Sequence, residues 1–198
     1  MKQLESIERL TDSFEHLPSI GYRTAERLAY SILDLPEDTI KDLIKNIEKV
    51  KTSVHECPVC GLLTDKEICD VCNDEYRNKD TLIVVSTSKN ALAIEKSTDK
   101  FKYHVLKGDI SLLKNITPDK LNFTSLLSRI KEQNIKEIII ATNPTVEGET
   151  TAHYLTKLLE GTDVIITRLA TGLPMGGELD YIDSLTIDRA INGRTKIK

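Results

Sequence analysis

The N-terminal part of the chain places apolar residues three and four positions apart, which is the period of amphipathic helices. This pattern covers residues 3–17 and 24–33 and continues from Pro36 to about residue 53. Two acids follow Pro36, and this combination is typical of a helix start, because proline fits the first turn and acids complement the helix dipole. The pattern therefore predicts a small helical unit over residues 1–55.

Short β-branched runs replace the helical pattern after residue 80. Residues 81–85, 137–141 and 163–167 are too short for helices and are typical of buried parallel strands. Residues 102–106 add a candidate fourth strand. Helical patterns lie between the strands, at residues 89–97, 123–133 and 147–160. This alternation predicts an α/β domain with a mainly parallel sheet.

Taken together, these patterns predict an α+β protein of several parts. We expect the helical unit at residues 1–55, a cysteine-rich finger at 56–73, the α/β domain at 80–175 and a C-terminal segment at 176–198. No internal repeat and no low-complexity linker separates them.

Charge and composition limit how the protein can meet nucleic acid. Lysine and arginine number 27 against 31 aspartates and glutamates, which gives a net charge of −4 in 198 residues. The field of the whole molecule does not attract nucleic acid, so any DNA contact must be local. Tryptophan is absent and aromatic residues make up 5%, which argues against a surface built mainly from base-stacking side chains.

The sequence also predicts a cytoplasmic protein. No run approaches the roughly 18 apolar residues that a membrane helix requires. The first five residues are too charged for a signal peptide.

All four cysteines of the chain lie in one stretch, as two Cys-x2-Cys pairs separated by eight residues. Cys57 and Cys60 form the first pair, and Cys69 and Cys72 form the second. Four thiolates at about 2.3 Å suit tetrahedral Zn²⁺, and each pair can present two sulfurs to one ion. The spacing predicts one structural zinc per chain. Two disulfides or unrelated buried thiols are the alternatives, and we expect the nearby His55 not to be a ligand.

Residues 17–21 join the first two predicted helices with the sequence Leu-Pro-Ser-Ile-Gly. This segment resembles a helix-hairpin-helix element, whose backbone N–H groups contact DNA phosphates regardless of sequence. We expect Gly21 to supply a left-handed backbone, although such hairpins usually also have a glycine where Ser19 stands. Arg23 and Arg27 share a helix face and are candidates for binding successive phosphates. A solvated arginine pair on an ordinary turn is the alternative.

The segment from Asn143 to Glu149 follows a predicted strand, where α/β sheets favour catalytic carboxylates. It resembles the second motif of Toprim domains, in which an Asp-x-Asp pair before Glu-Gly-Glu holds Mg²⁺. Asn143 and Thr145 replace the aspartates, and Ser86 stands where the first Toprim motif usually has a glutamate. The lost carboxylates predict that the chain is not an enzyme. Glu147 and Glu149 remain as weak cation ligands, as an acidic docking patch for a partner, or as helix N-terminal acids.

Residues 170–181 form a glycine-rich segment after the last predicted strand. No Gly-Lys-Ser or Gly-Lys-Thr and no Gly-x-Gly-x-x-Gly occurs in the chain, so no nucleotide cofactor is expected. We expect a close-packed turn that returns the chain to the sheet edge, with Met175 and Tyr181 as packing residues.

In their order and spacing, these motifs resemble the RecR family of bacterial recombination mediators. The likeness spans nearly the whole chain and includes the segment Gly-Leu-Pro-x-Gly-Gly-x-Leu-x-Tyr at residues 172–181. It implies a helix-hairpin-helix at residues 1–55, a four-cysteine zinc finger and a Toprim domain. It also implies a non-catalytic DNA repair factor that works with RecO and RecF to help load RecA at gaps, as a tetrameric ring or clamp on DNA at the bacterial nucleoid.

The resemblance also implies roles for particular residues. DNA contact falls on Gly21, Arg23 and Arg27, and partner contact falls on Glu147 with Glu149 beside it. The C-terminal segment is implied as an oligomer contact.

Two other functional classes remain open. One is a Mg²⁺-dependent Toprim enzyme, such as a nuclease or a primase-like protein. The other is a zinc-stabilised adaptor that binds only proteins.

Overall fold

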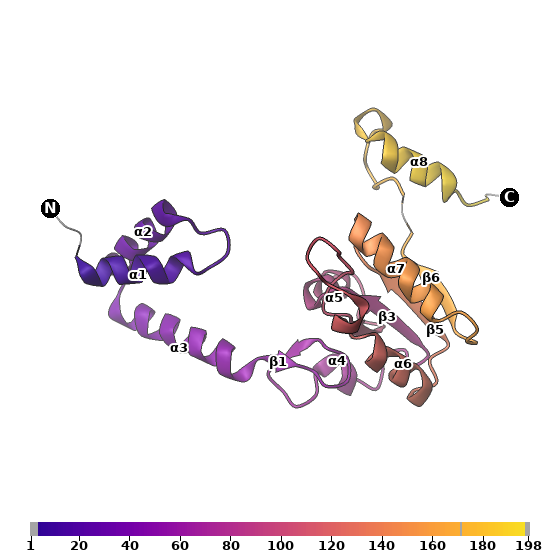
Figure 1. The fold of residues 1–198 in the computed structure, drawn as a ribbon, viewed down its shortest axis with the longest axis horizontal. Coiled ribbons are helices and arrows are strands. Elements are labelled where there is room, and N and C mark those ends of the chain that lie inside the picture. The colour runs from indigo at the N-terminus through magenta and orange to yellow at the C-terminus, as the bar shows by residue number, and fades with distance from the viewer. Residues whose placement is uncertain (1–3, 171, 197–198) are drawn as a thin grey trace. The chain divides into compact units, whose positions relative to one another are not determined.

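The computed structural model describes residues 4–170 and 172–196. The chain divides into two compact units, with the boundary between Val54 and His55. The first unit consists of helices, and the second contains the sheet (Figure 1).

The N-terminal unit consists of helices, as the sequence pattern predicts. They are α1 (Glu5–Glu15), α2 (Tyr22–Ser31), a short 3₁₀ turn (Ile32–Asp34) and α3 (Glu37–Ser53). Helices α1 and α2 pack against each other through small buried residues, among them Ala25 and Ala29 of α2, which are 0% and 1% exposed. Small side chains at this contact let the two helices approach closely, which supports the tight connection between them.

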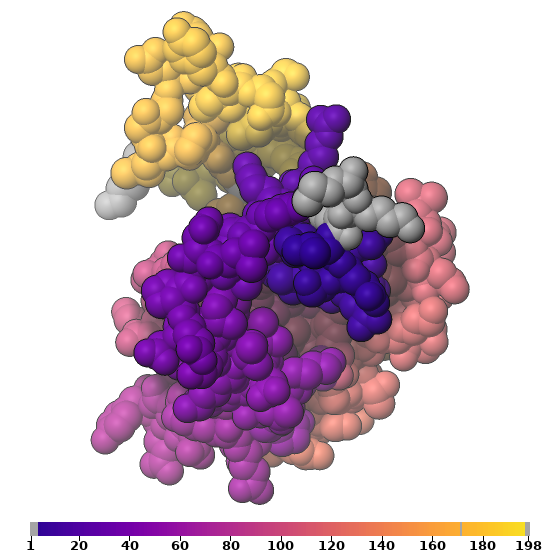
Figure 2. Space-filling model, turned by 90° about the vertical axis from the view of Figure 1, so that its left-hand side faces the viewer, coloured from indigo at the N-terminus to yellow at the C-terminus, as the bar shows by residue number. Residues whose placement is uncertain are grey.

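Helix α3 buries none of its described residues. Its apolar stripe is instead open to solvent, with Ile44 at 52%, Ile47 at 61% and Val50 at 62% exposed. Figure 2 looks onto this unit, drawn in indigo and purple. A 17-residue helix with such a stripe normally covers a core, so α3 presents an apolar surface that the described residues of its own unit leave uncovered.

A four-stranded parallel sheet forms the centre of the second unit, with strand order β4-β3-β5-β6. The strands are β3 (Thr81–Val85), β4 (Lys102–Val105), β5 (Glu137–Ala141) and β6 (Ile165–Arg168). Helices α5 (Ser88–Glu95), α6 (Phe123–Glu132) and α7 (Val146–Leu158) connect them. All four strands that the sequence predicts are present, and the mixed α+β class with a parallel sheet is confirmed.

Alternating residues of β3 point into two separate cores. Leu82 and Val84 join a cluster formed with helices α6 and α7. Ile83 and Val85 face the opposite side, where the cluster contains Ala91 of α5 and three of the cysteines. Because both faces are covered, the strand is buried along its whole length, which is why its sequence is continuously apolar rather than alternating.

The cysteine-rich finger is a layer of this second unit. It contains the antiparallel pair β1 (His55–Glu56) and β2 (Leu63–Thr64) and a single helical turn α4 (Asp70–Asn73). This hairpin encloses the first cysteine pair, Cys57 and Cys60, and its strands are only two residues long.

The chain beyond β6 differs from the sequence-based expectation. Residues 172–180 are exposed throughout, and Met175 and Tyr181 are 102% and 86% exposed rather than packed. A short 3₁₀ turn (Leu179–Tyr181) leads into α8 (Ser184–Asn192), a helix that the sequence analysis did not identify. A Cβ added at Gly172 or Gly176 would meet no atom within 4 Å. A Cβ at Gly177, in contrast, would lie 3.2 Å from Pro174 Cγ. The segment therefore contains a tight local turn, but this turn is exposed to solvent.

Among the residues that the structure describes, no helix combines the length and apolar character needed to cross a membrane.

His104 is a buried titratable residue on β4. It is 1% exposed, its Nε2 lies 3.0 Å from the carbonyl oxygen of Asn122, and its Nδ1 has no hydrogen-bond partner in the described part of the chain. Burial lowers the pKa of His104 to about 4, and the nearby charge of Arg129 acts in the same direction. The imidazole is therefore neutral at physiological pH.

This burial makes stability depend on acid pH. Because the folded pKa is below the unfolded value, the contribution of neutral His104 is complete above about pH 6.5 and is lost as the pH falls toward about 4. We expect His104 to lower the free energy of unfolding by about 2 kcal/mol between about pH 7 and about pH 4.5. Urea unfolding at a series of pH values should show this loss in the wild-type protein and in the exposed control His153→Gln. In His104→Gln the free energy of unfolding should not show this fall at acid pH. An equal fall in that variant would contradict the attribution of the pH dependence to His104.

Candidate functional site: a cysteine cluster, a hairpin and an altered Toprim edge

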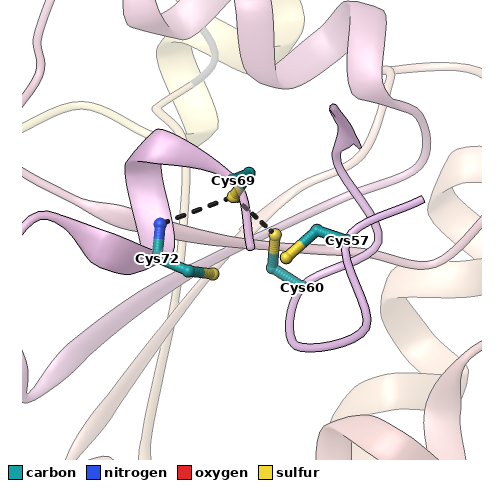
Figure 3. Close-up of side chains that lie close together, drawn as sticks. All are labelled: Cys57, Cys60, Cys69 and Cys72. Carbon is teal, nitrogen blue, oxygen red and sulfur yellow. Dashed lines mark hydrogen bonds between the residues drawn. The ribbon is translucent and has the colours of Figure 1, made fainter. Parts of the chain in front are cut away.

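The four cysteines converge as the sequence predicts (Figure 3). Their sulfur atoms all lie within 4.8 Å of one another, and the Sγ atoms of Cys60 and Cys69 are 3.4 Å apart. Cys57, Cys60 and Cys69 are buried and Cys72 is partly exposed. All four are free thiols, so the disulfide alternative does not describe this structure.

Hydrogen bonding shifts the pKa values of these thiols in opposite directions. The neighbouring thiols of Cys60 and Cys72, together with the backbone N–H of Cys72, lower the pKa of Cys69 despite its burial. Hydrogen bonding to Cys69 and Cys72 and burial raise the pKa of Cys60. Because the cluster stabilises one thiolate even without a metal, it is suited to a cation that all four sulfurs would coordinate as thiolates.

The geometry of the cluster fits zinc. Four sulfurs at about 2.3 Å from a tetrahedral ion lie about 3.8 Å from each other, and the observed limit of 4.8 Å is close to that spacing. Each knuckle provides two ligands, and four soft thiolates are the donor set of structural zinc sites. No histidine belongs to the cluster in the described residues, which agrees with the expectation that His55 is not a ligand.

The first knuckle is hydrogen-bonded to the edge strand β4. The backbone N–H of Val105 donates to the carbonyl oxygen of Cys60 at 2.8 Å. Gly61 has a φ of +78°, and a Cβ at this position would lie 3.2 Å from both the Cβ and the carbonyl oxygen of Val105. Glycine is therefore required here both for its backbone conformation and for the close approach of the knuckle to the strand.

Polar contacts fix the second knuckle and the segment after it. Lys102 Nζ donates to the carbonyl oxygen of Cys72 at 3.1 Å. Arg77 pairs with both oxygens of Glu95 on α5, with Asp74, and with the carbonyl oxygen of Phe101 at 2.9 Å. The Arg77 guanidinium lowers the pKa of Glu95, so this partly buried network ties the end of the finger to the Toprim-like sheet.

The hairpin between α1 and α2 has its left-handed residue in an unexpected place. Ser19 has a φ of +68°, whereas Gly21 is extended with φ −94° and ψ 169°. The expectation that Gly21 supplies the left-handed backbone is therefore wrong. The turn needs its left-handed residue two positions earlier, where a side chain costs roughly 1 kcal/mol relative to glycine.

Gly21 instead acts as the N-cap of α2. It has no side chain to cap the helix, and its carbonyl oxygen accepts from Thr24 and Ala25 at 2.9 and 3.0 Å. Arg23 and Arg27 follow on the solvent side and are both exposed. In the described residues neither arginine belongs to an ion pair, whereas Arg9 of α1 is bound to Glu5 at 2.6 Å. The two candidate DNA-contacting arginines are thus available to an external anion.

The carboxyl edge of the sheet has a polar network where Toprim enzymes place carboxylates. Ser86 follows β3, is 0% exposed and donates a hydrogen bond to Asp109, which comes from the loop after β4. Asn143 follows β5 and accepts from Asn90 of α5 at 3.1 Å. These contacts join neighbouring loops through neutral groups and a single carboxylate.

Thr145 is the N-cap of α7. Its hydroxyl accepts a hydrogen bond from the backbone N–H of Gly148 at 3.2 Å, and the Thr142 hydroxyl donates to the carbonyl oxygen of Gly148 at 2.9 Å. A Cβ on Gly148 would lie 2.0 Å from the carbonyl oxygen of Asn143. The residue that replaces a metal-binding aspartate therefore has a structural use, which is to start the following helix.

The two glutamates of this segment differ in their surroundings. Glu149 accepts a bidentate pair from Arg168 at the end of β6, with one contact at 2.9 Å, and lies 4.0 Å from Arg189 of α8. Arg168 lowers the pKa of Glu149. Glu147 is partly exposed and has no ion-pair partner among the described residues. Of the two candidate partner-binding acids, Glu147 is the one available to another molecule.

The structure thus unites the four cysteines, and it places Arg23 and Arg27 on one helix beside the hairpin. Sequence reasoning missed Arg168 as the partner of Glu149, Asp109 as the partner of Ser86, and the Arg77 network. Opposite charges separated by 19 residues, as in Glu149 and Arg168, have no periodic signal, although the position of Arg168 at the end of a predicted strand is one hint.

Comparison with protein families finds a match for each of four consecutive segments of the chain. A RecR helix-hairpin-helix model matches residues 7–51, and a model of the RecR zinc finger with four cysteine ligands matches residues 54–74. A Toprim domain model matches residues 80–170, and a RecR C-terminal model matches residues 172–195. The chain belongs to the RecR family. The resemblance inferred from the motifs is confirmed, and RecR membership supports a role as a recombination and repair mediator.

Family and geometry together assign one structural zinc to the RecR finger. When bound, the ion supplies a cross-link between the two knuckles, and Cys57, Cys60, Cys69 and Cys72 would hold it. The cysteines also belong to the core on one face of the sheet, so loss of the ion should loosen more than the finger.

Removal of zinc should therefore destabilise the second unit. We expect about one zinc per chain by elemental analysis, and a fall in Tm of roughly 10 °C or more on chelation. Cys60→Ser should release the metal and unfold early without a chelator. Restoring Zn²⁺ but not Mg²⁺ should recover the wild-type Tm, and an unchanged Tm in metal-free protein would rule out the structural role.

Proposed function

We propose that this protein is a non-catalytic mediator that encloses or clamps DNA and acts with RecO and RecF to promote RecA loading at gaps. The observation that carries the proposal is the combination of four RecR-type segments in order with a Toprim edge that lacks its usual carboxylates. On this proposal the protein works in the bacterial cytoplasm, at the nucleoid.

DNA contact is assigned to the hairpin and to Arg23 and Arg27. The hairpin matches the RecR helix-hairpin-helix, and both arginines are exposed. Two guanidinium groups a helical turn apart suit two phosphates of one strand, and this contact needs no particular base sequence.

The absence of catalysis is inferred from the altered Toprim edge. Magnesium in such sites is held by several hard anionic oxygens, and here Ser86, Asn143 and Thr145 occupy positions of carboxylates. The described residues contain no cluster of three acidic or metal-binding side chains other than the cysteines. A Mg²⁺-dependent nuclease or primase is the competing function, and robust Mg²⁺-dependent cleavage by pure protein would establish it.

Oligomer formation would cover the apolar surfaces that each unit leaves exposed. The stripe of α3 and the C-terminal segment are the two candidates. A ring of several chains would bring several arginine pairs to one DNA molecule, and such multivalent contact offsets the acidic charge of the chain.

Partner binding is assigned to the exposed side of the Toprim edge. Glu147 has no ion-pair partner among the described residues, and an acidic side chain at this site suits a basic surface of RecO or RecF. Glu149 contributes less directly, because Arg168 already occupies its carboxylate.

The DNA contact can be tested with Arg23→Ala combined with Arg27→Ala. We expect single-stranded and gapped DNA to bind roughly ten-fold more weakly at low salt, because two phosphate contacts are lost from each chain. The slope of log affinity against log salt should fall by about two for each chain that contacts DNA. Fluorescence anisotropy gives both quantities, with and without RecO.

Arg9→Ala is the matched control, since Arg9 is an exposed arginine of the same unit that is bound to Glu5. It should leave affinity and salt slope unchanged. Wild-type affinity in the Arg23/Arg27 double variant would reject DNA contact by the hairpin, and failure of the wild type to bind DNA even with RecO would favour a protein-only adaptor.

The oligomer can be tested with Ile47→Asp on α3. Because Ile47 is 61% exposed, the charge should change the stability of the single chain by no more than about 0.5 kcal/mol, while it opposes burial between chains. Light scattering coupled to size exclusion should report a smaller assembly than for the wild type. Thr52→Asp, on the other side of α3, should keep the wild-type mass, and an unchanged mass in Ile47→Asp would exclude the stripe as an interface.

A further inference from the structure

Tyr22 occupies a distinctive position in the N-terminal unit. It is the first residue of α2, between Gly21 and Arg23, and so directly follows the hairpin that matches the RecR helix-hairpin-helix. Its side chain is 49% exposed. Consecutive helical residues are about 100° apart around the axis, so the side chains of Tyr22 and Arg23 leave α2 on neighbouring faces.

Carboxylates lie near the Tyr22 ring. Glu26 raises the pKa of Tyr22 most, followed by partial desolvation and by the carboxylates of Glu8, Glu15 and Asp12. The phenol therefore stays neutral in an acidic setting that repels phosphate. An uncharged base faces no such repulsion, and the ring offers it an apolar surface.

The two exposed arginines of α2, in contrast, favour phosphate. Arg23 and Arg27 are exposed and belong to no ion pair in the described residues, so they attract phosphate. A nucleotide likewise has a charged part and an uncharged part, because its anionic phosphate and its neutral aromatic base are a few ångströms apart. The surface formed by Tyr22, Arg23 and Arg27 therefore has one region suited to each half of a nucleotide.

We propose that Tyr22 stacks on an unpaired base of DNA whose phosphates are bound by Arg23 and Arg27, and that this contact makes the hairpin favour single-stranded over duplex DNA. The inference rests on the proposed DNA contact of the hairpin and names the class of DNA that it selects. In a duplex each base is covered by its neighbours and its partner, so the ring has no free base face to meet. In a single strand the bases can turn outward onto an aromatic side chain.

Discrimination between single-stranded and duplex DNA can be measured separately from overall DNA affinity, because different residues are responsible for each. Phosphate contacts by the arginines serve both forms of DNA, whereas stacking serves only the single strand. Loss of Tyr22 should therefore change the ratio of the two affinities, and loss of the arginines should lower both.

The first test measures binding of labelled oligothymidylate and of a blunt duplex to the full-length, zinc-loaded protein. Tyr22→Ala should weaken binding to the single strand about ten-fold, which is within the range of one lost stacking contact. Binding to the duplex should stay within about two-fold of the wild type. Tyr22→Phe keeps the ring and should retain wild-type values for both, which separates stacking from any role of the hydroxyl.

A second test follows the ring directly. The chain contains no tryptophan, so Tyr22→Trp introduces a single fluorescent reporter at the site. Its emission should be quenched by oligothymidylate and little changed by the duplex. Tyr76→Trp is the control, because Tyr76 is 101% exposed and lies outside the hairpin unit; its emission should respond to neither DNA.

The outcomes distinguish this inference from the function on which it rests. If the Arg23/Arg27 double variant loses both forms of DNA while Tyr22→Ala keeps the wild-type ratio, stacking is overturned and the DNA contact stands. Equal weakening of both forms by Tyr22→Ala also overturns stacking. If the arginine variant and Tyr22→Ala both bind like the wild type, DNA contact by the hairpin is overturned and stacking with it.

Discussion

The close backbone contact between the first cysteine knuckle and strand β4 determines how the second unit is built. The hydrogen bond from Val105 to Cys60 and the approach at Gly61 bring the knuckle onto the edge of the sheet. Cys57, Cys60 and Cys69 then become part of the core that covers one face of β3 and β4. A zinc site in this position stabilises a layer of the α/β domain as well as its own loop.

The carboxyl edge of the same sheet is held together largely by neutral polar groups. Hydroxyl and amide groups at Ser86, Asn143 and Thr145 form hydrogen bonds between loops or cap α7. Neutral groups at these positions remove the repulsion that several carboxylates without a metal would create. The carboxyl edge is thus held together by the protein's own contacts, and its partly exposed acid Glu147 has no ion-pair partner among the described residues.

Much of this architecture could be predicted from the sequence, and the failures have identifiable causes. The four strands were found because β-branched runs are unambiguous when both faces of a sheet are covered, and the cysteine spacing identified the metal site. The left-handed residue of the hairpin was assigned to Gly21 rather than Ser19 because glycine is the usual indicator of that conformation. Helix α8 and the pairing of Arg168 with Glu149 were missed, since exposed elements and long-range ion pairs leave little periodic trace. The residue pattern also could not show that the stripe of α3 is uncovered, because burial depends on what packs against a helix and not on the helix alone.

The contact at Gly148 has a consequence for how such sequences drift over time. A side chain of any size there would collide with the Asn143 carbonyl oxygen, whether or not a cation is bound nearby. Steric exclusion therefore filters mutations at this codon for a packing reason that does not depend on metal binding or catalysis. The glycine of a Glu-Gly-Glu segment is consequently, by itself, no sign of an active magnesium enzyme.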